Sequence, residues 1–480
     1  MQFFALVFAL NLITSCSSEK KSSQKQKPNI IFIFADDQCY NTINALGNKE
    51  VITPNLDKLV ADGVTFTHTY NMGGWNGAVC IASRTMMNTG RFLWRAQKQV
   101  PNLDSLAGNG MMWGNLMQKA GYETYMTGKW HIATKPQNCY DHVVHERPGM
   151  PNQTPQGYDR PKSPADTTWR PWDKKYGGFW KGGKHWSEVL KEDAVAFIDS
   201  AAKKDKPFFM YLAFNAPHDP RQSPKKFVDM YPLENISVPK TFLPEYPYKE
   251  EMGAGKKLRD ERLAPFPRTE YAVKVNRQEY YAIITHMDYQ IGQIIDALKK
   301  SGELDNTYIF FGADHGLACG NHGLMGKQNM YDHSMRPPMI ILGPDLPKDK
   351  KVDVDVYLQD IMATALDIAG VEKPAYVEFN SLLPLAKGKQ TKSNYDAIYG
   401  AYVNYQRMIR KDGFKLIAYP NANKVLLFDL KKDPLEMNDL SEKPEYSAKV
   451  KELFDDLLKL QKDMDDTFDL TKLYNEVVKN

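Results

Sequence analysis

The chain has 480 residues, which is too long for one hydrophobic core, so we expect one large domain and one smaller domain. Basic and acidic residues nearly balance at a formal net charge of +4, and no long basic run suggests a nucleic-acid partner. An anionic partner would therefore have to be bound at a local site rather than attracted by a global field.

The N-terminal residues resemble a bacterial export signal. Residues 3–13 form an apolar run that is too short to span a bilayer and is typical of a signal-peptide core. Residues 13–16, with the sequence ITSC, resemble a lipobox in which Cys16 would be acylated, and residues 17–27 would form a polar tether. No positive charge precedes the apolar run, so a cleaved secretory signal or a mistaken start codon is the alternative. We expect export and a lipid anchor in the cell envelope, either periplasmic or surface-exposed.

Continuous apolar runs predict strands that are buried on both faces, as in a parallel sheet. Helix-spaced apolar residues lie between them, so we expect a large, mixed but mostly parallel α/β sheet flanked by helices. In such sheets, sites form beyond the carboxyl ends of the strands. The predicted strands are residues 29–34, 124–126, 207–214, 307–311 and 339–342, and the predicted helices are residues 54–62, 80–89, 103–120, 187–202, 279–300 and 360–369.

The first predicted strand ends in two adjacent carboxylates, Asp36 and Asp37. Two such groups beyond a buried strand are costly unless a cation neutralises them. For an isolated pair, a helix N-cap with a solvated neighbour is the alternative interpretation.

Cys80 is expected in the first turn of a helix that follows a flexible GGWNG segment and ends at Gly90. The first turn of a helix offers free N–H groups and the positive end of the helix dipole, and both favour anions. Arg84 lies one turn later on the same face and directs a fixed cation to the same place. The pattern predicts an anion site around a sulfur nucleophile.

The sequence Cys80-x-Ala82-x-Arg84, followed by Thr-Gly-Arg at residues 89–91, resembles the signature of the type I sulfatases of the alkaline phosphatase superfamily. The commoner signature has Pro where this chain has Ala82, a variant that the family also uses. The resemblance spans nearly all of the mature chain and implies hydrolysis of sulfate monoesters. In that family a maturase oxidises the cysteine to formylglycine, whose hydrate attacks sulfur, and one Ca²⁺ is bound. The implied metal ligands are Asp36, Asp37, Cys80 as formylglycine, Asp314 and His315.

The resemblance also assigns catalytic roles to residues at the predicted strand ends. Lys129 would hold the formylglycine oxygens, His131 would take a proton during sulfate release, and Lys327 would contact the bound sulfate. His218 would protonate the leaving alcohol, with fixation of its own turn as the alternative. The catalytic set is thus Cys80, Arg84, Lys129, His131, His218 and Lys327, with Asp37 accepting the attacking proton, and Lys129, His218 and Lys327 would also bind substrate. His322 and His333 are further candidates for substrate contact that no mechanism requires.

Two less regular regions complete the chain. Residues 135–186 lose periodicity, and their four tryptophans would either stack on sugar rings or attach the loop to its own domain.

Residues 28–386 would form the catalytic domain and residues 387–480 a small C-terminal α+β subdomain. Its predicted strands are residues 397–402, 406–411, 414–419 and 425–429, followed by a helix from Ser447, as N-cap, to about residue 464. Cys39, Cys139 and Cys319 show no paired framework and are expected to be buried thiols.

The implied function is hydrolysis of O-sulfate on an extracellular carbohydrate of the algal galactan or glycosaminoglycan type. The implied partners are that sulfated carbohydrate, a maturase and a lipid anchor in the outer membrane or cell surface, with no nucleic acid. Two alternatives remain open. One is a phosphodiesterase or phosphonate hydrolase of the same superfamily, and the other is a non-catalytic, glycan-binding surface lipoprotein in which Cys80 stays a thiol.

Overall fold

The structure, a computed structural model, describes residues 27–151 and 154–478, so the predicted lipidation site at Cys16 lies outside the described residues. The core is an eight-stranded sheet, and the predicted α/β fold is confirmed. Its strands are β1 (Asn29–Ala35), β2 (Val64–Tyr70), β4 (Glu123–Lys129), β5 (His142–Arg147), β8 (Phe208–Ala213), β9 (Thr307–Ala313), β10 (Met339–Leu342) and β11 (Lys350–Tyr357).

The strand order is β11-β2-β10-β9-β1-β8-β4-β5. The central strand β1 is parallel to β8 on one side and to β9 on the other. Only β10 runs antiparallel to its described neighbours, β9 and β2, so the sheet is mixed but mostly parallel. Every residue of β1 is buried, as expected for an apolar strand that is covered on both faces.

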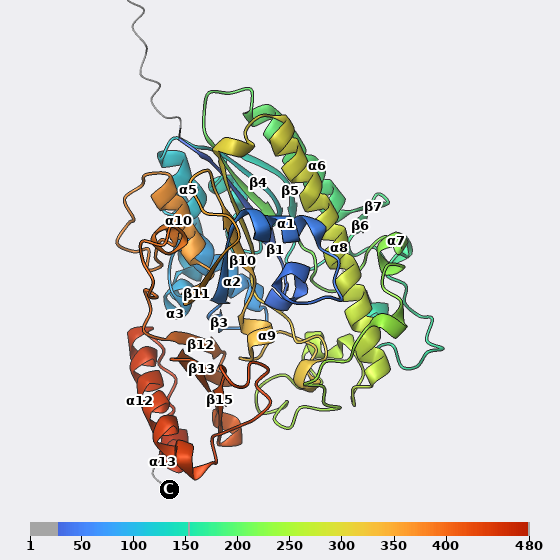
Figure 1. Cartoon of the computed structure of the whole chain (residues 1–480), viewed down its shortest axis with the longest axis vertical. Coiled ribbons are helices and arrows are strands. Elements are labelled where there is room, and N and C mark those ends of the chain that lie inside the picture. The colour runs from blue at the N-terminus through green and yellow to red at the C-terminus, as the bar shows by residue number, and fades with distance from the viewer. Residues whose placement is uncertain (1–26, 152–153, 479–480) are drawn as a thin grey trace, which may run out of the picture.

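Helices cover both faces of the sheet (Figure 1). Successive side chains of β1 point to opposite sides, so this apolar strand contributes to the core on each face. Ile31 and Ile33 pack with α1 (Pro54–Asp62), α6 (Trp186–Ala201) and α8 (Glu270–Lys300). Phe32 and Phe34 pack on the other face. The helices on that face are α2 (Val79–Thr89), α3 (Leu93–Gln99), α4 (Leu103–Gly108), α5 (Trp113–Lys119), α10 (Asp360–Ile368) and α11 (Leu383–Ala386).

A second sheet follows in the C-terminal part, in the order β15-β14-β13-β12-β3. Its strands are β3 (Gly73–Gly74), β12 (Ile398–Tyr402), β13 (Gln406–Lys411), β14 (Phe414–Tyr419) and β15 (Lys424–Asp429). The last four are antiparallel, as predicted, and α12 (Ser447–Asp463) and α13 (Thr471–Val478) follow them. The short β3 pairs with β12 and ties the segment before Cys80 to this sheet.

Several local predictions are corrected by the structure. Residues 103–120 form α4 and α5 instead of one helix, because Gly110 adopts a φ of 69° that ends the first helical segment. Ser447 is the first residue of α12 and not its N-cap, and its hydroxyl donates to the carbonyl of Pro444 over 2.9 Å. The predicted loop 135–186 contains β5 and a hairpin of β6 (Trp180–Lys181) and β7 (Lys184–His185). The three remaining described cysteines apart from Cys80 are buried thiols, as predicted.

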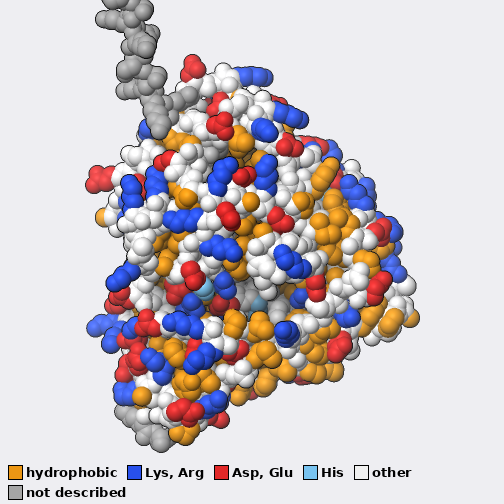
Figure 2. Space-filling view, in the orientation of Figure 1, with side chains coloured by type: hydrophobic (Ala, Val, Ile, Leu, Met, Phe, Trp, Pro, Cys, Tyr) orange, Lys and Arg blue, Asp and Glu red, His pale blue; other side chains and the backbone are white. Residues whose placement is uncertain are grey.

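The surface carries mixed charge. On the face shown in Figure 2, basic and acidic side chains are interspersed rather than gathered into one field. Among residues 27–151 and 154–478, none of the helices has both the length and the apolar character needed to cross a bilayer.

Candidate active site

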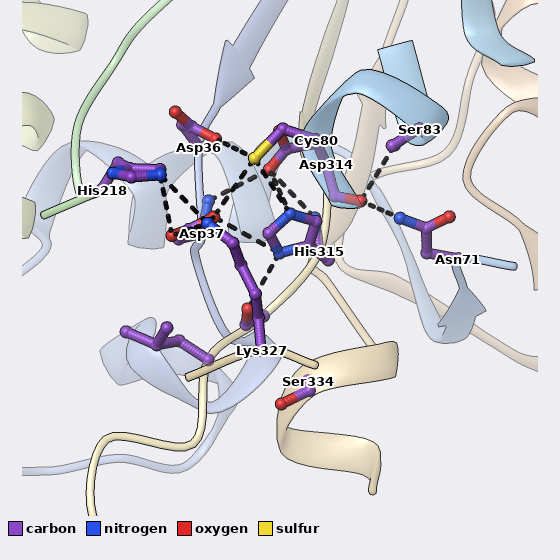
Figure 3. Close-up of polar contacts among 12 residues, drawn as sticks. Asp36, Asp37, Asn71, Cys80, Ser83, His218, Asp314, His315, Lys327 and Ser334 are labelled. Atoms are coloured by element: carbon purple, nitrogen blue, oxygen red, sulfur yellow. Dashed lines mark hydrogen bonds and ion pairs between the residues drawn. The ribbon is translucent and has the colours of Figure 1, made fainter. Parts of the chain in front are cut away.

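The carboxyl ends of β1 and β9 bring the predicted acidic residues together from distant parts of the chain. Asp36 and Asp37 follow β1, and Asp314 follows the neighbouring β9. The Asp37 N–H donates to Oδ1 of Asp314 over 3.1 Å. The carbonyl oxygen of Asp314 accepts hydrogen bonds from Asn71 at 2.5 Å and from Ser83 at 3.0 Å (Figure 3). The backbone therefore fixes three carboxylates that are fully buried.

Cys80 lies in the first turn of α2, which starts and ends close to where the sequence predicts. Its Sγ is 3.5 Å from Oδ1 of Asp36 and 3.3 Å from Nε2 of His315 (Figure 3). Burial raises the pKa of the thiol, but Lys129, Lys327 and His315 together outweigh burial and hold the pKa of Cys80 well below its usual range. The site therefore favours negative charge at this position.

Two further cations stand beside these carboxylates. Arg84 donates from Nε to Oδ2 of Asp314 over 3.2 Å and from Nη1 to the carbonyl oxygen of Lys129 over 2.8 Å. Lys129, at the end of β4, contacts the carboxylate of Asp36. Both side chains are fully buried, so their charges stay close to the carboxylates and are not screened by solvent.

Burial lowers the pKa of His131 and the nearby Cys80 opposes this shift, but His131 does not have the backbone geometry that the sequence suggests. Alternation along an extended strand predicts that Lys129 and His131 share a side, yet β4 ends at Lys129 and His131 has a φ of 56°. Asp37 is also left-handed, with a φ of 68°. Such strained residues cluster at functional sites. The buried Nδ1 of His131 has no hydrogen-bond partner among the described residues.

His218 and Lys327 contact each other and Asp37. The Nζ of Lys327 lies 3.0 Å from Nε2 of His218 and 2.7 Å from Oδ2 of Asp37. Burial and Lys327 both lower the pKa of His218, but Asp37 and Asp219 outweigh them and raise it to about 10. The neighbouring carboxylates thus favour the protonated form of the imidazole.

Sequence reasoning did not select Asp219, which contacts His218, or the two residues Tyr158 and Arg259 that contact Asp219. Oδ1 of Asp219 lies 3.0 Å from Nδ1 of His218. The Tyr158 hydroxyl donates to Oδ2 of Asp219 over 2.6 Å, and Nη2 of Arg259 lies 3.7 Å from Oδ1. Asp219 could have been selected from the sequence, because it directly follows His218 in the chain. Nothing local marks Tyr158 or Arg259, because both are distant from His218 in the chain.

His322 and His333 lie outside this group of contacts. In the part of the chain that the structure describes, Nδ1 of His322 lies 3.4 Å from Nε2 of His333, and Nε2 of His322 lies 3.1 Å from the carbonyl oxygen of Glu436. The pair therefore holds the loop that precedes Lys327 against the C-terminal part of the chain.

The tryptophans of residues 135–186 mostly serve packing. Trp169, Trp180 and Trp186 are buried, and Arg160 and Arg147 lie over the rings of Trp169 and Trp186. Their burial favours the interpretation that they attach the loop to its own domain.

The acidic cluster fits a divalent cation. One donor atom from each of Asp37, Cys80, Asp314 and His315 lies within 4.8 Å of the others. Ca²⁺ takes oxygen ligands at about 2.3–2.6 Å, so opposite ligands of one ion are about 4.6–5.2 Å apart. Asp36 lies beside this group, and burial together with Asp314 raises its pKa well above the usual range. The carboxylates therefore repel one another, and a cation would stabilise them.

Comparisons with known proteins agree with this geometry. The family model described as sulfatase matches residues 28–371, and the model described as N-sulphoglucosamine sulphohydrolase, C-terminal, matches residues 320–463. An N-acetylglucosamine-6-O-sulfatase of Bacteroides thetaiotaomicron is 28% identical, and the match covers 95% of this chain and 89% of that protein.

Solved structures share the fold. A protein solved in complex with its substrate, D-glucosamine-2-N,6-O-disulfate, is 25% identical, with a TM-score of 0.68 over 92% of this chain and 99% of that chain. A phosphonate monoester hydrolase from Silicibacter pomeroyi has a TM-score of 0.72 at 21% identity, over 92% of this chain and 96% of that chain. At that identity, the second likeness concerns the fold alone.

Proposed function

We propose that this chain, which belongs to the sulfatase family and hydrolyses sulfate esters, removes O-sulfate groups from an extracellular carbohydrate. The observation that carries the proposal is the convergence of Cys80 with three buried carboxylates and three buried cations beyond the ends of parallel strands. Cations in a dry site stabilise the negative charge that develops on sulfate oxygens during ester hydrolysis.

The proposal includes formylglycine, made from Cys80, and one Ca²⁺ held by Asp36, Asp37, Asp314 and His315. Formylglycine at this position would supply, as its hydrate, an oxygen nucleophile. A bound calcium would supply positive charge to the site. Exchange of sulfur for oxygen at residue 80 also suits this metal, because Ca²⁺ prefers hard oxygen ligands. Oδ1 of Asp37 lies 3.9 Å from Sγ of Cys80, so this carboxylate is placed to accept the proton of the attacking group.

His218 is the proposed proton donor to the leaving oxygen. Its Nε2 and the Nζ of Lys327 are 3.0 Å apart, so a sulfate group that contacts the lysine brings its bridging oxygen near the same imidazole. A sugar alcohol is a poor leaving group and depends on general acid help. His131, beside residue 80, takes the remaining proton during sulfate release.

Two similar proteins support the proposal that the substrate is a carbohydrate. One acts on the 6-O-sulfate of N-acetylglucosamine, and another was solved with a disulfated glucosamine. We propose a sulfated polysaccharide of the algal galactan or glycosaminoglycan type.

The proposed location is the bacterial cell envelope, with a lipid anchor on Cys16 and a maturase that acts on Cys80. Its support is the lipobox-like ITSC sequence after the apolar run of residues 3–13. Metabolic labelling with an alkyne fatty acid should mark the wild-type protein and leave Cys16→Ala unmarked. Equal labelling of both proteins would contradict the anchor.

The decisive experiment is a screen of the purified enzyme on defined sulfated mono- and oligosaccharides, beside an aryl sulfate, an aryl phosphodiester and an aryl phosphonate. Sulfate release from a sugar, with much weaker turnover of the phosphorus esters, is the expected result. A preference for the phosphonate would favour the phosphonate hydrolase alternative. Glycan binding without hydrolysis, on protein that carries an unmodified Cys80, would favour the binding lipoprotein.

A further inference from the structure

The two ring nitrogens of His218 face different surroundings. Nδ1 lies 2.7 Å from the backbone carbonyl oxygen of Asp219 and 3.0 Å from its carboxylate. Nε2 lies 3.0 Å from Nζ of Lys327, the residue that contacts Asp37. Because Nδ1 is engaged by Asp219, Nε2 is the nitrogen that can face a substrate. The direction of the ring is therefore set from the Nδ1 side.

The carboxylate of Asp219 is itself held in place. Asp219 is only 2% exposed, and a buried carboxylate requires hydrogen-bond partners. Tyr158 donates to Oδ2 over 2.6 Å, while Oδ1 faces His218 and lies 3.7 Å from Nη2 of Arg259. Each carboxylate oxygen thus has its own neighbours, and the Tyr158 hydroxyl fixes the orientation in which the carboxylate faces the histidine.

Tyr158 is held by the residues that follow it. The Asp159 N–H donates to the carbonyl oxygen of Arg262 over 2.5 Å, and Nη2 of Arg262 lies 2.6 Å from the Asp159 carboxylate. Arg160 donates from Nη1 to Glu279 on α8 over 2.7 Å. Tyr158 is 7% exposed, so its hydroxyl is presented to Asp219 by a backbone that is already ordered.

We propose that Tyr158 and Asp219 are positioning residues for the proton donor, which hold the ring of His218 so that Nε2 faces the leaving oxygen. The inference rests on the proposed role of His218 as general acid. Orientation of a catalytic group is a large effect, since a displacement of about 1 Å can cost about 10²-fold in rate. Neither residue is assigned a contact with the sulfate group.

The test compares two substrates that differ in their need for a proton. A sulfated sugar releases an alcohol that requires general acid help, whereas 4-nitrophenyl sulfate releases a stable phenolate. Tyr158→Phe, which removes only a hydroxyl, should lower kcat on the sugar by about 10-fold or more and change kcat on the aryl sulfate little. Asp219→Asn should show the same selectivity with a larger loss, and KM should stay near the wild-type value in both variants.

Three measurements distinguish positioning from a general loss of structure. The ratio of sugar to aryl turnover within one variant is independent of the fraction of folded protein. Tyr176→Phe is the matched control, because the hydroxyl of Tyr176 lies in the same loop but donates to the carbonyl oxygen of Thr168. The double variant Tyr158→Phe/Asp219→Asn should be no worse than Asp219→Asn alone, since Tyr158 acts through Asp219.

The results separate failure of this inference from failure of the proposed acid. If His218→Ala is selective for the sugar while Tyr158→Phe and Asp219→Asn keep the wild-type ratio, the positioning role is overturned and the acid role stands. If His218→Ala reduces both substrates by the same factor, both roles are overturned. Fully additive losses in the double variant would also overturn the proposed linkage through Asp219.

Discussion

Replacement of Lys415 by Met tests how the C-terminal sheet is attached to the catalytic part of the protein. Lys415 lies in β14 and is fully buried. Its Nζ is 2.5 Å from Oδ1 of Asp332, 2.6 Å from Oε1 of Glu436 and 3.1 Å from the carbonyl oxygen of Met330. Asp332 lies on α9 (Asp332–Met335), a few residues after Lys327 in the chain. Methionine keeps much of the side-chain length and removes the charge, so two buried carboxylates lose their shared cation.

The structure determines both the size of the effect and its pH dependence. Removal of one partner from a buried ion pair costs about 3–5 kcal/mol, because the remaining charge stays buried. Asp332 keeps Arg336 at 3.7 Å, so Glu436 is the group that will take up a proton. Burial raises the pKa of Glu436 from its ordinary value of 4.5 to about 7, although Lys415 lowers it, so the substitution raises this pKa further.

The direction of the pH dependence follows from the raised pKa of Glu436. A carboxyl group with a raised pKa in the folded state contributes stability that is fully present below the unfolded pKa and is lost as pH rises through the folded pKa. Each tenfold increase in the proton affinity of the folded state corresponds to about 1.4 kcal/mol. Lys415→Met should therefore lose more stability at about pH 8.5 than at about pH 6, where Glu436 is largely protonated in the variant.

Urea unfolding, followed by tryptophan fluorescence at both pH values, measures the effect. Lys424→Met is the matched control, because Lys424 in the adjacent strand β15 pairs with Glu442, whose side chain is 83% exposed. Loss of such a surface pair should cost less than about 1 kcal/mol. The reasoning is refuted if the two variants lose the same stability at about pH 8.5, or if the loss in Lys415→Met does not shrink toward pH 6.

Three predictions concern the active site. Peptide mass spectrometry of protein made in a host with a maturase should find formylglycine at position 80, and Cys80→Ala should fold but release no sulfate; active protein with only unmodified Cys80 would contradict the mechanism. Elemental analysis should find about one calcium per chain, and Asp314→Asn should lower both this content and the rise in Tm on calcium addition; metal-free protein with chelator-resistant activity would contradict the site. Arg84→Lys should lose most activity although the charge is kept, because lysine lacks the planar fork that reaches both Asp314 and the carbonyl oxygen of Lys129; wild-type kcat in this variant would show that charge alone is sufficient.

Elements with a strong local signal were predictable from the sequence. The apolar run of β1 indicated burial on both faces, and Gly90 ends α2 in the left-handed conformation with a φ of 70°. The spacing of Cys80 and Arg84 depends on one helical turn, so it also required no tertiary information. Strands β2 and β11 were not predicted, because they alternate polar and apolar residues and the prediction relied on continuous apolar runs.

The tertiary structure alone decided how the site residues meet. His315 lies 3.3 Å from Cys80 although 235 positions separate them in the chain, and this proximity depends on the placement of β9 beside β1. Tyr158 reaches Asp219 because Asp159 and Arg160 are held by two other segments. The sequence by itself determined which side chains are available and which local elements carry them. Their distances, and the partners of His218, follow from strand order and loop packing, because contacts between distant segments have no local periodicity that a sequence can display.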